Sequence, residues 1–528
     1  MSYQEARRQP LSKSDWLFSG GYVDNVQNVD LAPQFSPYLR NCRLDGQSII
    51  IRPGHSLIST LTAWDYPKGI SWYLRTDASN DRLIVRHNTD ATHKLYSITT
   101  TWVATSIDTG ANITSDNRMS FQNVNDVLYC MNWVDDFGKL EWTTYTLPST
   151  WIADFSPSFS VIFNSSHFAS GWSDNANTVY KSVGNDYEDF NSSWSDQFTF
   201  PETITGLSAN LEALFYFTKN TISVTGFSDI QETAGSITYI TRSLQVKEGA
   251  INQGSIVETG RNTYFLTPSN KIGMLARGAN IDGFETMELS ERAYKGISKI
   301  MSILDPDQTD SFGYFLQKEN LIKWFLKTRG STINDICVVF DVEKNAFLID
   351  EQKYFYWGTN FKGNNYTISM VEPKVYQDEY AQDDEDSPIP FEYRTKEFYI
   401  SDPTIKKIFR ETRTMLDINE LAVMTQEMYI DGVLVDSKTV DSDNITPITW
   451  GLWTIAVWTF AIGTEWSSET GEGEYFEIYI LRTKGMLNKK GRKIQFRFTN
   501  GSLAWKLRLK SVNLKAEILP EITSNLTK

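Results

Sequence analysis

Short stretches in which apolar and polar residues alternate fill most of the chain, and turn residues separate them at spacings of about 8 to 12 residues. The first group lies between Gly69 and Asp108 and contains GISWYLRTD, RLIVRHN, KLYSITT and WVATSID. A period of two places successive side chains on opposite faces of a β-strand. These four stretches therefore predict four consecutive strands.

Comparable groups recur along the next 240 residues or so, as far as about residue 342. They are RMSFQNV, VLYCMNW and KLEWTTYT; SFSVIFN and TVYKSVG; ALFYFTKN and TISVTG; SIVETG, TYFLTPSN and KIGMLA; and FGYFLQ, IKWFLKT and ICVVFDV. Strand groups that restart about every 40 to 50 residues are typical of propeller blades. We therefore predict an all-β protein whose residues 38–375 form a β-propeller of six or seven blades. A large two-sheet sandwich array would show the same alternation and is the alternative. The best helical candidates, residues 289–300 and 406–412, are short.

The segment FSGGYVDNVQNVDLAPQFSPYLRNCRLDGQSIIIRPGH, residues 18–55, begins with a double glycine. It lacks the Lys-Ser/Thr pair of a phosphate loop and the third glycine of a dinucleotide fingerprint. Pro33 and Pro37 disfavour a helix, because proline lacks a donor and keeps its predecessor extended. We expect residues 1–37 to form an extended arm that lies along the propeller or a neighbouring subunit. Residues 43–52 should then form a hairpin with its turn at Asp45-Gly46, and this hairpin should start the first blade.

The stretch YQDEYAQDDEDSPIP, residues 376–390, carries six carboxylates: Asp378, Glu379, Asp383, Asp384, Glu385 and Asp386. Their mutual repulsion and the two prolines predict a linker. Beyond it, residues 391–528 contain about eight alternating stretches, among them FEYRTKEFYI, QEMYIDG and KIQFRFTN. That number of strands in this length predicts one β-sandwich.

Composition and net charge limit the range of possible functions. The net charge is −15 and the isoelectric point is near 4.9, which opposes general attraction to nucleic acid. We expect that the protein is not exported by a signal peptide, because the first residues lack a signal-peptide core. We also expect no membrane-spanning segment, because no stretch approaches the roughly 20 apolar residues of a membrane helix. The odd number and wide spacing of Cys42, Cys130 and Cys337 predict reduced core residues of a protein made in a cytoplasm.

The sequence contains few residue patterns that are typical of catalytic sites. The four histidines form neither an HxH nor an HExxH metal-binding motif. The sequence also lacks the GxSxG motif that carries the nucleophile of many serine hydrolases. Acids such as Asp186, Glu188 and Asp189 leave a glycan-degrading enzyme open, since that reaction needs two carboxyl groups about 5 to 10 Å apart. We nevertheless predict a protein that is not an enzyme and that has no cofactor, no metal and no catalytic residue.

One basic stretch stands out in this acidic chain, because residues 482–515 contain eleven Lys or Arg and no Asp or Glu. We interpret Lys489, Lys490, Arg492 and Lys493 as a face that docks an acidic neighbour or touches passing DNA. The acidic partner would be Asp383, Asp384, Glu385 and Asp386 of the adjacent subunit. Alternatively, the basic residues are the solvent sides of two strands, since KIQFRF and WKLRLK alternate charged and apolar residues.

Several stretches in a fixed order resemble virion proteins of short-tailed bacteriophages. They are LAPQFSPYLRNCRLDGQSIIIRPG, NTVYKSVGNDYEDFN, ITGLSANLEALFYFTKNTISVTG, VKEGAINQGSIVETGRNTYFLTPSNKIGML, CVVFDVEKNAFLID, and toward the end KKIFRETRTMLDI and GRKIQFRFTN. The family is that of the tail nozzle (tail tubular B-like) proteins, in which a sandwich follows a propeller.

This resemblance implies a structural protein of the virion tail, synthesised in the host cytoplasm. It further implies a homo-oligomeric ring, usually a hexamer, below the portal and its adaptor, through whose channel the genome DNA leaves without specific binding. The nozzle and a related hub or fiber-attachment position are both open. An acidic wall would suit such a passage, since it repels phosphates. The alternative is a tail-associated adhesin whose Trp-rich loops bind a host surface glycan.

Overall fold

 The computed structural model describes the chain except for residues 1–9, 14–19, 27–29, 33, 62–65, 76–80, 90–91, 100, 108–112, 114–116, 142–143, 148–154, 191–195, 211, 227–229, 234–235, 245, 278–283, 293–294, 352, 400–405, 419–422, 442–476, 501–506 and 519–528.

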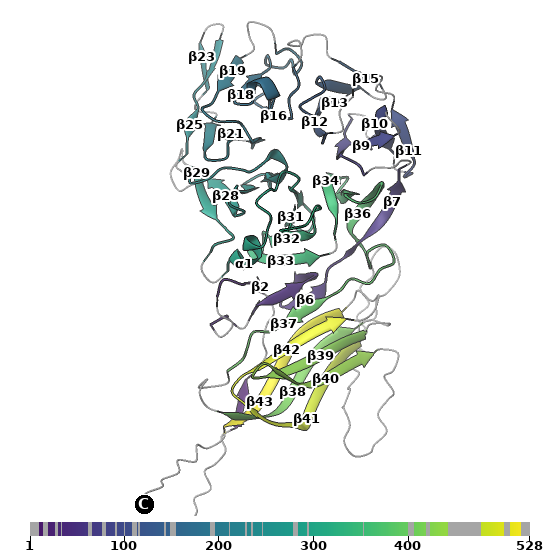
Figure 1. The fold of residues 1–528 in the computed structure, drawn as a ribbon, viewed down its shortest axis with the longest axis vertical. Coiled ribbons are helices and arrows are strands. Elements are labelled where there is room, and N and C mark those ends of the chain that lie inside the picture. The colour runs from purple at the N-terminus through teal and green to yellow at the C-terminus, as the bar shows by residue number, and fades with distance from the viewer. Residues whose placement is uncertain are drawn as a thin grey trace, which may run out of the picture.

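Seven groups of four antiparallel strands follow one another around a ring in the described chain (Figure 1), six of them as four-stranded sheets and one as part of a six-stranded sheet. The first four contain, in order, β8 (Gly69–Tyr73), β9 (Arg82–Thr89), β10 (Thr92–Ile98) and β11 (Ala104–Ile107); β12 (Ser120–Val124), β13 (Val127–Met131), β14 (Gly138–Glu141) and β15 (Thr144–Thr146); β16 (Phe159–Phe163), β17 (Ser166–Ser170), β18 (Thr178–Lys181) and β19 (Asp196–Thr199); and β20 (Gly206–Ala209), β21 (Ala213–Phe217), β22 (Ile222–Gly226) and β25 (Arg242–Ser243). A separate hairpin, β23 (Ile230–Thr233) and β24 (Ser236–Tyr239), extends from the fourth group.

The last three groups complete the ring. They contain β26 (Val257–Glu258), β27 (Thr263–Leu266), β28 (Ile272–Arg277) and β29 (Phe284–Glu288); β30 (Phe312–Leu316), β31 (Leu321–Leu326), β32 (Ile336–Asp341) and β33 (Ala346–Glu351); and β34 (Phe355–Phe361), β35 (Asn364–Ser369), β36 (Lys374–Ala381) and β7 (Gly54–Thr60). The fold is therefore a β-propeller, and the prediction of six or seven blades resolves to seven. The N-terminal strand β7 closes the ring, because it pairs with β36 in the last blade.

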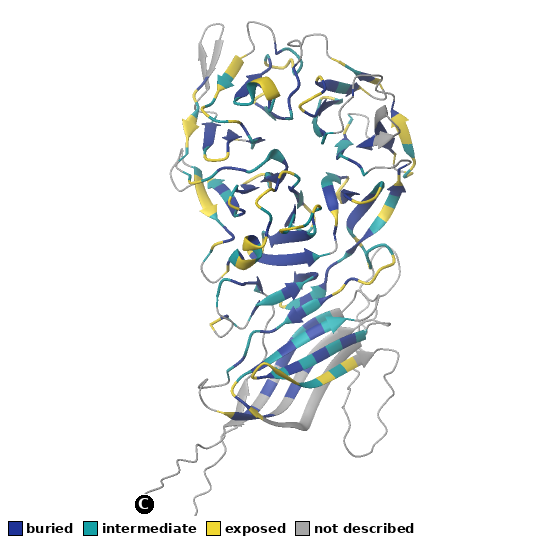
Figure 2. Ribbon diagram, viewed as in Figure 1, coloured by how far each residue is buried: buried dark blue, intermediate teal, exposed yellow. Residues whose placement is uncertain are grey.

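The middle strands of a blade are buried on both faces, as in β31 and β32, where every residue is buried (Figure 2). Neighbouring blades cover both faces of each sheet, so these strands read as continuous apolar runs. Helix is scarce in the described chain: α1 spans Ser298–Ser302, and the 3₁₀ turns η2 and η4 span Ser173–Asn175 and Gln253–Ser255. The predicted helix at 406–412 is wrong, because that stretch begins a long strand.

Two further sheets form the second β-domain, drawn below the ring in Figure 1. One contains β41 (Glu477–Gly491), β38 (Lys407–Ile418), β43 (Leu507–Ile518), β6 (Ser48–Ile51) and β5 (Cys42–Asp45), with β1 (Pro10–Lys13) also paired to β43. The other contains β4 (Tyr38–Arg40), β37 (Glu392–Arg394), β42 (Ile494–Asn500), β39 (Val423–Ile430) and β40 (Val433–Asp441). Burial alternates strictly along β39, as expected for a strand with one face on a core.

The N-terminal hairpin is placed differently from the prediction. Its strands β5 and β6 and its turn at Asp45-Gly46 form as expected, but β6 pairs with β43 of the second domain and does not start the first blade. The arm does lie along the propeller: β2 (Gly21–Tyr22) pairs with β33, and β3 (Phe35–Ser36) pairs with β2. Local alternation predicted the hairpin, whereas β6 and β2 also pair with strands that lie more than 300 residues away along the chain.

The acidic stretch 376–390 is not the solvated linker that its charge predicts. Its first residues belong to β36, which is paired on both sides with β35 and β7. Asp378 is buried there. The reason is that cations from distant strands neutralise these carboxylates. The prediction considered only the repulsion between acidic residues that are neighbours in the sequence.

Candidate functional site

A cluster of buried charges lies where the last two blades meet the β5–β6 hairpin. Its members come from five separate parts of the chain: the hairpin, β31, the end of β33, the loop after it, and β36 with its following turn. We call this cluster the junction network; it consists of Arg43, Arg52, Lys323, Lys353, Asp350, Asp378, Glu379 and Asp384. Four cations thus face four carboxylates, so the network is formally neutral.

Two lysines and two neighbouring acids form its centre. Lys323 donates to Asp378 and, over 2.6 Å, to Glu379. Lys353 donates to Asp378 and, over 3.3 Å, to Glu379. The Tyr314 hydroxyl donates to Asp378 over 2.6 Å. All four charged side chains are at most 1% exposed, so each charge depends on its protein partners for solvation.

The hairpin arginines join this centre. Arg43 donates two hydrogen bonds to Asp350, of 2.8 and 2.6 Å, and two to Glu379, of 3.2 and 2.6 Å. Arg52 donates to Asp384, over 2.9 Å from one nitrogen, and its Nε donates to Asn41 over 2.9 Å. Paired hydrogen bonds from one guanidinium fix orientation as well as distance. The network therefore ties the hairpin, and with it the second domain, to the propeller.

The network also shifts pKa values. Burial alone would raise the pKa of Asp378, but Lys323 and Lys353 outweigh burial and hold it well below its usual range. Burial opposes ionisation of Glu379 in the same way, yet Arg43 and the two lysines lower its pKa to about 2. Both acids are therefore ionised at neutral pH, and their charges are part of the folded structure.

The sequence contains a signal that could have located part of this network. Lys323 lies in the middle of LIKWFL, a strand that is otherwise entirely apolar, and Lys353 follows a second buried strand. A lysine at such a position is almost never fully buried unless it is paired. The pattern indicates a buried partner, but it does not identify β36 as its source.

The predicted acidic docking residues divide into two pairs. Asp384 binds Arg52 within the same chain, and Glu385 binds Lys374 at 2.7 Å. These two carboxylates are already neutralised, so the structure argues against their use as contacts for a neighbouring subunit. Asp383 is partly exposed and Asp386 is exposed, so docking stays a prediction for this pair.

The predicted basic residues lie at the turn between β41 and β42. The side chain of Lys489 lies outside the described residues, and Lys490 is exposed. The backbone amides of Arg492 and Lys493 donate to Asp431, and the Lys493 ammonium binds Glu397 at 2.6 Å.

The strand that follows this turn matches the alternative interpretation. Ile494, Phe496 and Phe498 of β42 are buried, while Arg497 between them pairs with Glu392 at 2.7 Å. This part of the basic stretch therefore forms the polar side of a sandwich strand.

Of the acids considered for glycan cleavage, Glu188 is engaged by neighbouring side chains. Glu188 binds the Lys139 ammonium at 2.9 and 3.0 Å and accepts from the Tyr129 hydroxyl at 3.3 Å. The described residues contain no group of three or more His, Cys, Asp or Glu side chains suited to a metal ion. Nor do they include a helix long and apolar enough to cross a membrane.

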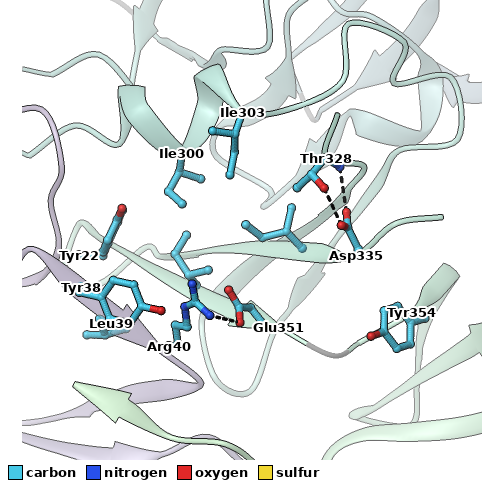
Figure 3. A pocket seen from close by; sticks show the side chains of 12 residues that line it. Tyr22, Tyr38, Leu39, Arg40, Ile300, Ile303, Thr328, Asp335, Glu351 and Tyr354 are labelled. Atoms are coloured by element: carbon cyan, nitrogen blue, oxygen red, sulfur yellow. Dashed lines mark hydrogen bonds and ion pairs between the residues drawn. The ribbon is translucent and has the colours of Figure 1, made fainter. Parts of the chain in front are cut away.

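A cavity of about 310 Å³ lies beside the junction, between the arm, α1 and the end of β33. Figure 3 shows Ile300 and Ile303 projecting from α1 toward it and Arg40 facing Glu351 across from them. Arg40 and Glu351 are paired at 2.7 Å, and Asp335 accepts from Thr328. The lining is thus an apolar floor with a rim of polar groups that bind one another.

Comparisons with known proteins give no family. No family model matches the chain, and no curated protein matches it. Similar solved structures include YCF48 from Cyanidioschyzon merolae, with 10% identity over 62% of this chain and 98% of that one and a TM-score of 0.38. The β-propeller domain of Myceliophteria thermophila Cps50 (Swd1) has 7% identity over 61% and 98% and a TM-score of 0.41. At these values the likenesses carry no functional argument, and the propeller assignment rests on the sheets described above.

Proposed function

We propose that this protein is a structural subunit of a bacteriophage tail, forming a nozzle or hub ring below the portal and adaptor through which the genome is ejected. The order of the sequence stretches that resemble tail nozzle proteins supports this proposal. So does the architecture, since a propeller followed by a two-sheet β-domain is what that resemblance implies. By the same resemblance, the ring would be a homo-oligomer of six copies.

The observation that carries the proposal is the way the two domains are joined. Domains connected by a single linker usually move relative to one another. Here β6 of the N-terminal hairpin pairs with β43 near the C-terminus, and Arg43 of the same hairpin binds Asp350 and Glu379 in the propeller. Tilting one domain against the other would break this pairing and separate buried charges. A rigid block of this kind suits a ring subunit that must keep a channel open under load.

The charge of the chain agrees with a passage for DNA. At a net charge of −15, the protein repels phosphates on average and offers no general basic footprint. DNA would then slide past the subunits without being held.

The test is native mass spectrometry and electron microscopy of the purified full-length protein, followed by gold-labelled antibody on phage particles from the source. We expect a closed ring and label confined to the tail below the portal. A monomer at every concentration, with label on lateral fibers and binding to a glycan, would instead identify an adhesin. Absence of label from particles would refute the proposal altogether.

Docking through the exposed part of the basic turn is tested in the same assay. Lys490→Glu with Arg492→Glu should weaken ring assembly if this turn contacts Asp383 and Asp386 of the next subunit. The matched control is Lys318→Glu with Arg261→Glu, which makes the same charge change at exposed positions of the propeller. Equal assembly of both double variants would remove the docking hypothesis and leave the ring proposal standing.

A further inference from the structure

The axis of the propeller contains a second cavity, of about 390 Å³. Each of the seven blades contributes to its wall through its innermost strand or the residues that lead into it. The lining includes Ser71, Gln122, Ser160, Glu258, Gly313 and Thr359, one from every blade except the fourth, which contributes Ala209. The site is thus assembled by closure of the ring and does not exist in any single blade.

Among the described residues that line this cavity, Glu258 carries the one ionisable side chain. Its Oε1 accepts the backbone N–H of Ala209 over 2.9 Å. The side chain is exposed to water, yet the surrounding protein raises its pKa by desolvation. An ionised carboxylate at this position is only partly solvated, so a cationic group beside it interacts with it more strongly than in bulk water.

The rest of the lining offers neutral polar groups and aromatic rings. The lining residues Ser71, Gln122 and Thr359 carry hydroxyl or amide groups, and Trp72 and Trp357 are also lining residues. Such side chains hydrogen-bond hydroxyl groups and pack against the apolar faces of polyols. The guanidinium of Arg118 stacks on the Trp357 ring at 3.7 Å, but Arg118 is not a lining residue.

We infer that the axial cavity binds a small hydroxylated amine, of the class of amino alcohols and amino sugars. The ligand's ammonium pairs with Glu258, and its hydroxyl groups meet the hydroxyl and amide side chains around the ring. A neutral polyol lacks the ion pair. An anion is repelled by the Glu258 carboxylate. The volume of about 390 Å³ lies within the range of pockets that hold small molecules, and one hexosamine is of that size.

The experiment is isothermal titration calorimetry of the full chain with glucosamine, N-acetylglucosamine and glucose as probes. Glucosamine carries an ammonium, whereas the other two sugars are neutral at the same size or larger. We expect one glucosamine site per chain and binding at least about 10-fold weaker for both neutral sugars, because a charge-assisted contact is lost. Equal binding of the three sugars, or no binding of glucosamine, overturns the inference.

Two variants test the position of the site. Glu258→Gln keeps an acceptor for the Ala209 amide while removing the charge, and Thr359→Lys places a competing ammonium in the cavity. Both should reduce glucosamine affinity at least about 10-fold, whereas Glu343→Gln, at an exposed turn outside the cavity, should not change it. Thermal melting of each variant verifies that the propeller is intact. Wild-type affinity in folded Glu258→Gln contradicts the assignment and leaves the tail proposal untouched.

Discussion

Replacing Lys323 by methionine removes one cation from the junction network while nearly preserving side-chain volume. At 2.6 Å from Glu379, the lysine charge contributes about 6 kcal/mol of attraction at an effective dielectric constant of about 20. Desolvation of the two ions offsets much of this. Breaking such a buried pair nevertheless costs about 3–5 kcal/mol, because the remaining carboxylate is buried without its partner. We expect Lys323→Met to lose that amount of stability at the junction.

Hydrogen exchange, detected by mass spectrometry, measures this loss of stability in individual segments of the chain. Amides of β6 and β43 should exchange about 10²- to 10⁴-fold faster in Lys323→Met, as the free-energy loss requires. Lys271→Met is the matched control, since Lys271 binds Glu288 and Glu291 at a partly exposed site, where an ion pair contributes at most about 1 kcal/mol. The double variant Lys323→Met with Glu379→Gln should recover part of the loss, because it restores charge balance. Equal exchange in Lys323→Met and Lys271→Met would refute the reasoning.

Three further outcomes are expected. Since the folded pKa of Glu379 is about 2 and its unfolded value is about 4.3, its stabilising contribution is complete above the unfolded value and is lost as the pH falls toward 2; urea midpoints that stay constant from pH 5 to 2 would contradict this. Gly54→Ala places a methyl group 1.7 Å from the Asp383 carbonyl oxygen and should lower the melting temperature, whereas Gly184→Ala, with open space around it, should not. Asp24→Ala removes the acceptor for the first amides of α1 and should cost about 0.5–2 kcal/mol in urea unfolding, with Asp24→Asn closer to wild type.

The candidate site was only partly predictable. The sequence places a basic turn at residues 489–493, and Lys490 and Arg492 are exposed there, while docking through this turn stays a prediction. The acidic stretch was interpreted from its own repulsion alone. Asp378 and Glu379 are held by lysines 25 to 56 residues away along the chain. Repulsion between neighbours is visible in a sequence, whereas neutralisation by distant cations depends on which strands become adjacent.

The sequence by itself determined the strands, their grouping and the all-β class, because side-chain alternation and turn residues act over a few residues. The strands of the first blade, for example, lie where GISWYLRTD, RLIVRHN and KLYSITT place them. Only the tertiary structure decided that β7 closes the seventh blade and that β6 pairs with β43. An edge strand can pair with any other exposed edge, so its partner is selected by the packing of the whole chain and by the burial of complementary charges.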